Sequence, residues 1–217
     1  MSYQAVIWDV DGTLLNTLQD QADATNAALI AFDFPPHDPD AYRYLIGGGL
    51  RRLIEGILPD DVAPTEDLIV QLSGEYKLQY EEHWNKTTSA YEGIPETLDV
   101  LTTLNVPMAL LSNKPEAFLT KVVAEFLSRW PFQVVIGQRD DMPHKPDPAG
   151  IFAILEELGH DASQAIYIGD TPGDMGTALN AGVRAVGVEW GFRSREELLR
   201  AGADVVLKNP GELLDLL

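Results

Sequence analysis

Asp9 and Asp11 are the residues of this sequence whose types and spacing point most directly to chemistry. They follow the apolar run Ala5–Trp8, which is typical of a buried strand. Carboxylates two positions apart at a strand end point to the same side of the chain, and Gly12 allows a sharp turn after them. Because their charges repel, we expect a hard cation or a shared proton to compensate them. This sheet edge is where ligands bind in open α/β folds.

A second pair of carboxylates, Asp170 and Asp174, follows a later apolar run. The run covers residues 165–168, and the pair lies on a tight turn that enters a predicted helix. Hard oxygen ligands of this kind suit Mg²⁺, which takes few protein carboxylates and completes its shell with water and phosphate. The sequence therefore predicts a site for a hard cation built from strand ends.

Groups that could bind an anion stand at two further strand ends. Ser112 and Asn113 precede a predicted helix, whose free N–H groups and dipole favour negative charge, although Ser112 taken alone is more simply an N-cap. Lys145 lies in a proline-rich loop, where the stiff backbone would hold it in place as a phosphate clamp. The other interpretation of Lys145 is an ordinary solvated lysine.

Strand and helix signals alternate along most of the chain. Such alternation favours an α/β fold with a Rossmann-like parallel sheet and right-handed crossovers. The first strand leads to a helix over residues 17–32. Later strands are predicted at 107–111, 132–136, 165–168, 183–188 and 204–206, with helices at 94–104, 115–127, 147–158, 172–180, 196–200 and from 210 onward.

Residues 34–90 break this alternation and show helical patterns without a convincing strand. We therefore predict a helical cap over residues 17–89, inserted into a catalytic core formed by residues 1–16 and 90–217. In the cap, Arg51 and Arg52 follow a run of three glycines. They could bring a cation to a second anionic group of a substrate, or they could be surface arginines of a flexible connector.

The composition narrows the classes of partner. The chain has 217 residues, 15 Lys and Arg against 34 Asp and Glu, a net charge of −19 and no cysteine. Such an acidic chain disfavours nucleic acids and anionic membranes, and an anionic ligand would need locally concentrated positive charge. We find neither a signal peptide nor a membrane-spanning segment, and expect a cytoplasmic protein, either a monomer or a homodimer.

The order of these motifs carries more information than any one of them. Asp-x-Asp-Gly-Thr at 9–13, Ser112, Lys145 before a proline, and Gly-Asp-Thr-x-x-Asp at 169–174 each follow a predicted strand. This series resembles the four-motif signature of the haloacid dehalogenase-like hydrolase superfamily, whose helical cap follows the first motif. Residues 113–115, 144–148 and 202–204 look most like members of the phosphoglycolate phosphatase type.

The resemblance implies a role for each motif. Asp9 would be the nucleophile that forms an aspartyl-phosphate, and Asp11 would protonate the leaving group and then activate water. The Asp9 carboxylate, the Asp11 backbone carbonyl and Asp170 would bind Mg²⁺, with Asp174 as a further ligand or just behind the site.

The phosphoryl oxygens would be held by the remaining motif residues. These are the backbone N–H groups around Gly12 and Thr13, together with the side chains of Ser112, Asn113 and Lys145.

Two branches of the superfamily fit the sequence less well. Dehalogenases lack a carboxylate at the position of Asp11, because halide leaves without a proton. Phosphonatases use a cap lysine, and the cap candidates Lys77 and Lys86 look like surface residues. Asn16 and Thr17, which depart from a common family pattern, are expected to cap a helix rather than to affect catalysis.

We therefore expect a Mg²⁺-dependent phosphatase for a phosphate monoester of a small metabolite, of the phosphoglycolate type. A phosphomutase or an inorganic pyrophosphatase on the same core are the alternatives, followed by a non-catalytic binding protein on this scaffold.

Overall fold

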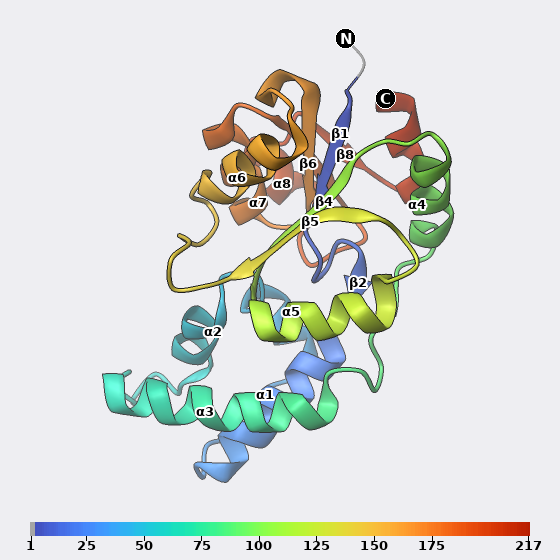
Figure 1. Ribbon diagram of the computed structural model, residues 1–217. Coiled ribbons are helices and arrows are strands. Elements are labelled where there is room, and N and C mark those ends of the chain that lie inside the picture. The colour runs from blue at the N-terminus through green and yellow to red at the C-terminus, as the bar shows by residue number, and fades with distance from the viewer. Residues whose placement is uncertain (1–2) are drawn as a thin grey trace.

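The central element of the fold is a sheet of six parallel strands, seen in a computed structural model that describes residues 3–217. Its spatial order is β5-β4-β1-β6-β7-β8 (Figure 1). The order confirms the predicted α/β architecture with a parallel, Rossmann-like sheet. The strands are β1 Ala5–Trp8, β4 Met108–Pro115, β5 Phe132–Gln138, β6 Ala165–Gly169, β7 Arg184–Val188 and β8 Val205–Leu207.

Helices cover both faces of this sheet, which explains why its strands read as nearly continuous apolar runs. In β1, Val6 and Trp8 face one apolar cluster, whereas Ala5 and Ile7 face the other. The first face is covered by α4 Ile94–Thr103, α5 Glu116–Val122 and the 3₁₀ helix η4 Pro210–Leu216. Helix α5 continues as the π-helical turn η2 Val123–Leu127. The second face is covered by α6 Ala149–Leu158, α7 Pro172–Ala181 and α8 Arg195–Arg200, and η3 Ala162–Gln164 precedes β6.

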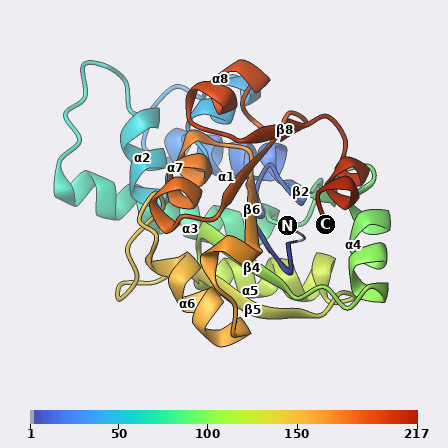
Figure 2. The ribbon, with the colours of Figure 1, turned by 90° about the horizontal axis from the view of Figure 1, so that it is seen from above.

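The insertion after β1 consists of helices with an apolar cluster of their own. It lies at the carboxyl ends of the strands, beneath the sheet in Figure 1 and behind it in Figure 2. Leu29, Ile54, Leu72 and Tyr80 are among its fully buried members. Its elements are α1 Leu18–Ala31, η1 Pro39–Tyr44, α2 Leu50–Ile57 and α3 Glu66–His83.

A short antiparallel ladder pairs the segment that leads from the sheet into the insertion with the segment that leads back. Strand β2 Leu15–Asn16 pairs with β3 Ser89–Ala90. The sequence predicts neither of these two strands, because two residues are too few to show a periodic pattern. The division into a cap over residues 17–89 and a core over 1–16 and 90–217 stays a prediction. Within residues 3–217, no helix combines the length and the apolar character that crossing a bilayer requires.

Candidate active site

The candidate catalytic residues lie at the carboxyl ends of three neighbouring strands. Strand β1 lies between β4 and β6 in the sheet, and all three run in parallel. Asp9 follows β1, Asp170 follows β6, and Ser112 and Asn113 lie in the last part of β4. These side chains lie close together because the three strands are adjacent and parallel, so that their carboxyl ends meet at one edge of the sheet.

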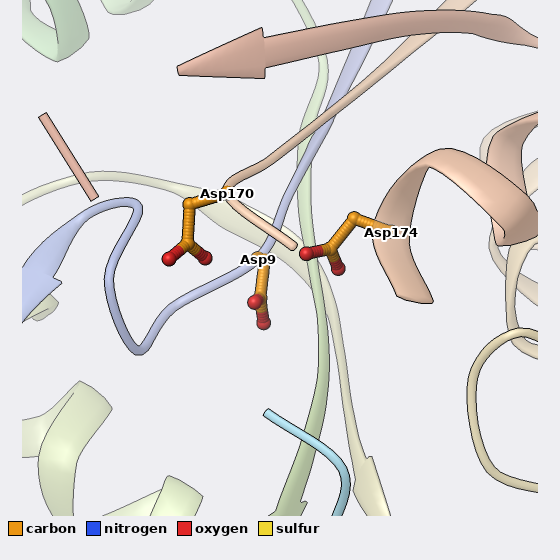
Figure 3. A group of neighbouring side chains, drawn as sticks. All are labelled: Asp9, Asp170 and Asp174. Atoms are coloured by element: carbon orange, nitrogen blue, oxygen red, sulfur yellow. The ribbon is translucent and has the colours of Figure 1, made fainter. Parts of the chain in front are cut away.

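Three buried carboxylates form the centre of the site. One oxygen each of Asp9, Asp170 and Asp174 lies within 4.8 Å of the others (Figure 3). Burial raises the pKa of Asp9 to about 7, against the opposing effect of the Lys145 ammonium. Burial and the neighbouring carboxylates likewise raise the pKa of Asp170 well above its usual range. Negative charge therefore exceeds its compensation by protein groups, as in a site for a divalent cation.

Among residues 3–217, Lys145 supplies the one ammonium group that contacts any of these three carboxylates. Its Nζ atom lies 2.6 Å from Oδ1 of Asp174 and 2.9 Å from Oδ1 of Asp9, and its side chain is almost completely buried. Burial alone would lower the pKa of Lys145, but Asp174 and Asp9 raise it above its usual value. The backbone N–H of Lys145 donates to Oδ1 of Asn113 at 2.9 Å, which fixes the loop that carries the lysine.

The surroundings of Asp170 and Asp174 distinguish the two carboxylates. Both oxygens of Asp174 accept hydrogen bonds from protein: Oδ1 from Lys145 and from the Tyr167 hydroxyl, Oδ2 from the N–H and hydroxyl of Thr171. Although burial would raise the pKa of Asp174, Lys145 and these hydrogen bonds lower it. Asp174 is thus better placed to orient Lys145 than to bind a cation directly.

Asp9 and Asp170 offer the better oxygens for a cation. Asp170 accepts one bond on each oxygen, from the Thr13 hydroxyl at 3.2 Å and from the Phe192 N–H at 2.7 Å. Oδ1 of Asp9 contacts Lys145 but accepts no well-aligned hydrogen bond from residues 3–217. Hard carboxylate oxygens with unused lone pairs fit a divalent cation of the Mg²⁺ type.

Gly12 and Thr13 form the turn that brings Asp9 and Asp170 together. Gly12 has φ of 84°, and a Cβ atom there would lie 2.3 Å from Oδ2 of Asp170. Any other residue would therefore be strained and would displace the carboxylate. The same turn is held by Trp190, whose Nε1 donates to the backbone oxygen of Thr13 at 2.9 Å.

Asp11 lies in a hydrogen-bond network that the sequence did not reveal. Lys114 Nζ donates to both of its carboxylate oxygens, at 3.0 and 3.1 Å. The Thr17 hydroxyl donates to Oδ1 of Asp11 at 2.8 Å and accepts from Nε2 of Gln21 at 2.8 Å. Thr17 makes no side-chain capping hydrogen bond at the start of α1, so its hydroxyl orients Asp11 instead of serving the predicted cap.

Two of the residues assigned to the phosphoryl group also make contacts within the protein. Ser112 Oγ accepts from the Lys114 N–H at 3.2 Å, and Asn113 Nδ2 donates to the Gly47 backbone oxygen of the insertion at 3.0 Å. Both side chains are buried and both line the cavity beside Asp9. Their position is compatible with phosphate binding, which stays a prediction.

Arg51 and Arg52 lie in different surroundings. Arg51 is exposed and pairs with Glu66 at 2.8 Å and with Glu55 at 2.8 Å, away from the cavity beside Asp9. Arg52 lines a separate hollow of about 390 Å³, together with Thr171. The geometry thus gives no support to Arg51 as a specificity residue, and for Arg52 the role stays a prediction.

The cavity beside Asp9 lies between the sheet and the insertion. The core contributes Asp11, Lys114, Lys145 and Phe118 to its lining. The insertion contributes one polar residue, Gln21, and apolar or aromatic residues, namely Ile46, Leu50, Leu53, Tyr76 and Tyr80. Its free volume is about 30 Å³, which is room for about one water molecule. With the insertion in this position, little free space remains beside the carboxylates.

Comparisons with known proteins agree with this geometry. The sequence model of a family described as haloacid dehalogenase-like hydrolase matches residues 6–188. The N-acetylmuramic acid 6-phosphate phosphatase of Pseudomonas aeruginosa is 29% identical, over 100% of this chain and 96% of the relative. The phosphoglycolate phosphatase of Pseudomonas savastanoi pv. phaseolicola is 32% identical, over 97% of this chain and 75% of the relative.

Solved structures share the fold over nearly the whole chain. A crystal structure from Lactobacillus delbrueckii subsp. bulgaricus superposes with a TM-score of 0.90 at 26% identity, covering 98% of this chain and 97% of that one. A hydrolase from Pseudomonas syringae superposes with a TM-score of 0.80 at 24% identity, covering 98% and 96%. These likenesses include the helical insertion as well as the sheet.

Proposed function

The chain belongs to the haloacid dehalogenase-like hydrolase family, and on that premise we propose that it is a Mg²⁺-dependent phosphatase for a small phosphate monoester of the phosphoglycolate type. The observation that carries this proposal is the meeting of Asp9, Asp170 and Lys145 at one buried edge of the sheet, with Asp11 beside them. Phosphoryl transfer to water requires a nucleophile, a cation site, an ammonium group that holds the phosphate and an acid–base group.

The reaction proceeds in two displacements at phosphorus. A carboxylate oxygen of Asp9 attacks the phosphorus atom, and the bond between phosphorus and the ester oxygen breaks. Asp11 donates a proton to that oxygen, so that the substrate leaves as an alcohol. Asp11 then accepts a proton from a water molecule whose oxygen attacks the aspartyl-phosphate, which releases inorganic phosphate and restores Asp9.

The cation is assigned to the carboxylates with unused lone pairs. Asp9, Asp170 and the backbone carbonyl of Asp11 would hold Mg²⁺, and Asp174 would orient Lys145 behind it. Bound there, Mg²⁺ would neutralise negative charge on the phosphoryl oxygens and favour the ionised form of the nucleophile. Lys145, Ser112 and the turn that begins at Gly12 supply the other contacts to the phosphoryl group.

The size of the cavity favours a small leaving group. About 30 Å³ of free space is left beside Asp9 when the insertion lies against the sheet, and apart from Gln21 the side chains that the insertion contributes are apolar or aromatic. A small leaving group is enclosed with less displacement of the insertion than a large one, and enclosure excludes competing water.

A phosphate ester of an amino sugar acid is the second candidate. One relative is a phosphatase for N-acetylmuramic acid 6-phosphate. The hollow of about 390 Å³ that Arg52 lines also reaches Lys145, and it could accommodate a sugar ring if the substrate extends to that side.

Phosphate release from a substrate panel tests the proposal. The panel contains phosphoglycolate, N-acetylmuramic acid 6-phosphate, ethyl phosphate, pyrophosphate, sugar phosphates, nucleotides and p-nitrophenyl phosphate, each with Mg²⁺ and with EDTA. We expect release that requires Mg²⁺ and is fastest with phosphoglycolate. Preference for pyrophosphate would identify a pyrophosphatase, and isomer conversion without release would identify a mutase. Absence of any reaction would refute the proposal.

A further inference from the structure

Lys114 is a buried cation for which the two displacements described above have no use. We infer that its ammonium group selects substrates that carry a carboxylate beside the leaving oxygen, which makes Lys114 a specificity-determining residue. The inference rests on the proposed phosphatase function and extends it to the part of the substrate that is not phosphate.

The position of Lys114 sets it apart from the other basic residues. Its side chain is 3% exposed, and it lines the cavity together with Asp9 and Asp11. Among the described residues, the other basic side chain that lines this cavity is Lys145, which is held between Asp9 and Asp174. Lys114 instead pairs with Asp11, a carboxylate outside the group of Asp9, Asp170 and Asp174.

The contacts of Lys114 leave it able to bind a second anion. Its Nζ atom donates to the two oxygens of Asp11 and lies 4.8 Å from the centre of the Tyr80 ring. An ammonium has three donors, and one of them can turn from Asp11 to a substrate oxygen without breaking the ion pair. The Tyr80 ring holds the ammonium at the cavity wall through a cation–π contact.

The opposite wall gives such an anion few competing partners. Leu53 and Tyr76 are apolar or aromatic, Gln21 already donates to Thr17, and the Tyr80 hydroxyl makes no hydrogen bond within residues 3–217. A carboxylate that enters this space leaves water, so its binding depends strongly on Lys114, because Lys145 is held between Asp9 and Asp174. A methyl group in the same place loses nothing when the ammonium is removed.

The distance from the reacting centre restricts where the carboxylate must lie. Lys114 is bonded to Asp11, the group that protonates the leaving oxygen, so its donors reach atoms next to that oxygen. A carboxylate separated from the ester oxygen by one carbon meets this requirement, as in phosphoglycolate and other esters of α-hydroxy acids. Esters whose charge lies farther away would not reach Lys114.

Two isosteric pairs of compounds test the inference. The first pair consists of substrates: phosphoglycolate carries a carboxylate where ethyl phosphate carries a methyl group. Phosphonopropionate and propylphosphonate show the same difference but cannot be hydrolysed, so their binding can be measured by calorimetry with Mg²⁺ and without turnover. The variant is Lys114→Met, and Lys121→Met is the matched control, because Lys121 is an exposed lysine of α5 that pairs with Glu81.

We expect Lys114→Met to lower the preference for the carboxylate, in kcat/KM and in binding, by about tenfold to hundredfold, as for a lost charged hydrogen bond. Lys121→Met should leave the preference unchanged. A Lys114→Met variant that slows both substrates equally and binds both phosphonates with the wild-type ratio would overturn the inference and reduce Lys114 to a support for Asp11.

Two further measurements keep the outcome interpretable. Lys114→Arg retains the charge and should keep most of the preference, which separates charge from packing. If Lys114→Met does not fold, the double variant Asp11→Asn/Lys114→Met removes the unpaired carboxylate, and its phosphonate binding is compared with that of Asp11→Asn. If no ester is hydrolysed, the proposed function fails, whereas the binding ratios still decide the role of Lys114.

Discussion

The ammonium nitrogen of Lys145 lies 2.9 Å from Oδ1 of Asp9, and both side chains are almost completely buried. The same nitrogen contacts Asp174, so one cation stabilises two of the three central carboxylates. Removing it leaves buried negative charge without a partner, which is costly even when the rest of the site stays in place.

We predict that Lys145→Met slows phosphate release about hundredfold to thousandfold and lowers the free energy of unfolding by about 3 kcal/mol. Steady-state kinetics and urea unfolding measure the two effects. Lys77→Met, a change of an exposed lysine in α3, is the control and should alter neither. A Lys145→Met enzyme with near-native turnover would exclude the clamp.

Binding of a divalent cation should stabilise the fold through Asp170. A ligand that binds only the folded state raises its stability in proportion to the logarithm of its concentration. We expect saturating Mg²⁺ to raise the melting temperature by about 5 °C relative to EDTA. The rise should disappear in Asp170→Asn and persist in Asp60→Asn, whose carboxylate is exposed. An equal rise in all three proteins would place the cation elsewhere.

The raised pKa of Asp9 predicts a pH dependence of stability without metal. Burial raises this pKa from 3.8 to about 7, so between these values the folded state keeps a proton that the unfolded chain has lost. The contribution of Asp9 to stability therefore falls as the pH rises through this window.

Asp9→Asn has no such ionisation. In EDTA we expect this variant to be more stable than the wild type above about pH 7, by on the order of 2 kcal/mol, and the two to converge near about pH 4. Urea unfolding across this range measures the difference. A variant less stable than the wild type at neutral pH would show that the Asp9 charge is already compensated by protein groups.

A general acid matters most when the leaving group is basic. Asp11→Asn should slow the hydrolysis of ethyl phosphate by about hundredfold or more, and that of p-nitrophenyl phosphate by less, because nitrophenolate leaves without a proton. Neither leaving group carries a carboxylate, so the comparison does not involve the proposed role of Lys114. The exposed Asp23 of α1 supplies the control Asp23→Asn. Equal losses on both substrates would argue that Asp11 does not act as the acid.

The sequence was most informative where function coincides with a strand end. Asp9 and Asp170 follow strands whose apolar runs are unmistakable, and a parallel sheet brings such ends together whatever the details of packing. The α/β fold and the helical insertion were predictable for the same reason, because long periodic segments dominate both. The two-residue ladder of β2 and β3 was not predicted.

The residues that sequence reasoning missed depend on how the elements pack. In the sequence, Lys114 is notable only as part of residues 113–115, which resemble a family motif. Its spacing does not predict a contact with Asp11, which lies more than a hundred residues earlier. Thr17 is a residue type that favours N-cap positions, but its hydroxyl donates a hydrogen bond to Asp11. The sequence left Arg51 open between a substrate contact and a surface arginine, and its pairing with Glu66 from the next helix depends on how the two helices pack.

Trapping of the phosphorylated enzyme tests the central claim most directly. Wild-type protein is mixed with phosphoglycolate and Mg²⁺, quenched in acid within the first turnover, digested and analysed by mass spectrometry. We predict that the peptide containing Asp9 gains the mass of one phosphoryl group, that hydroxylamine removes it, and that Asp9→Asn shows neither the adduct nor turnover. Rapid turnover without any adduct, together with an active Asp9→Asn variant, would contradict the account.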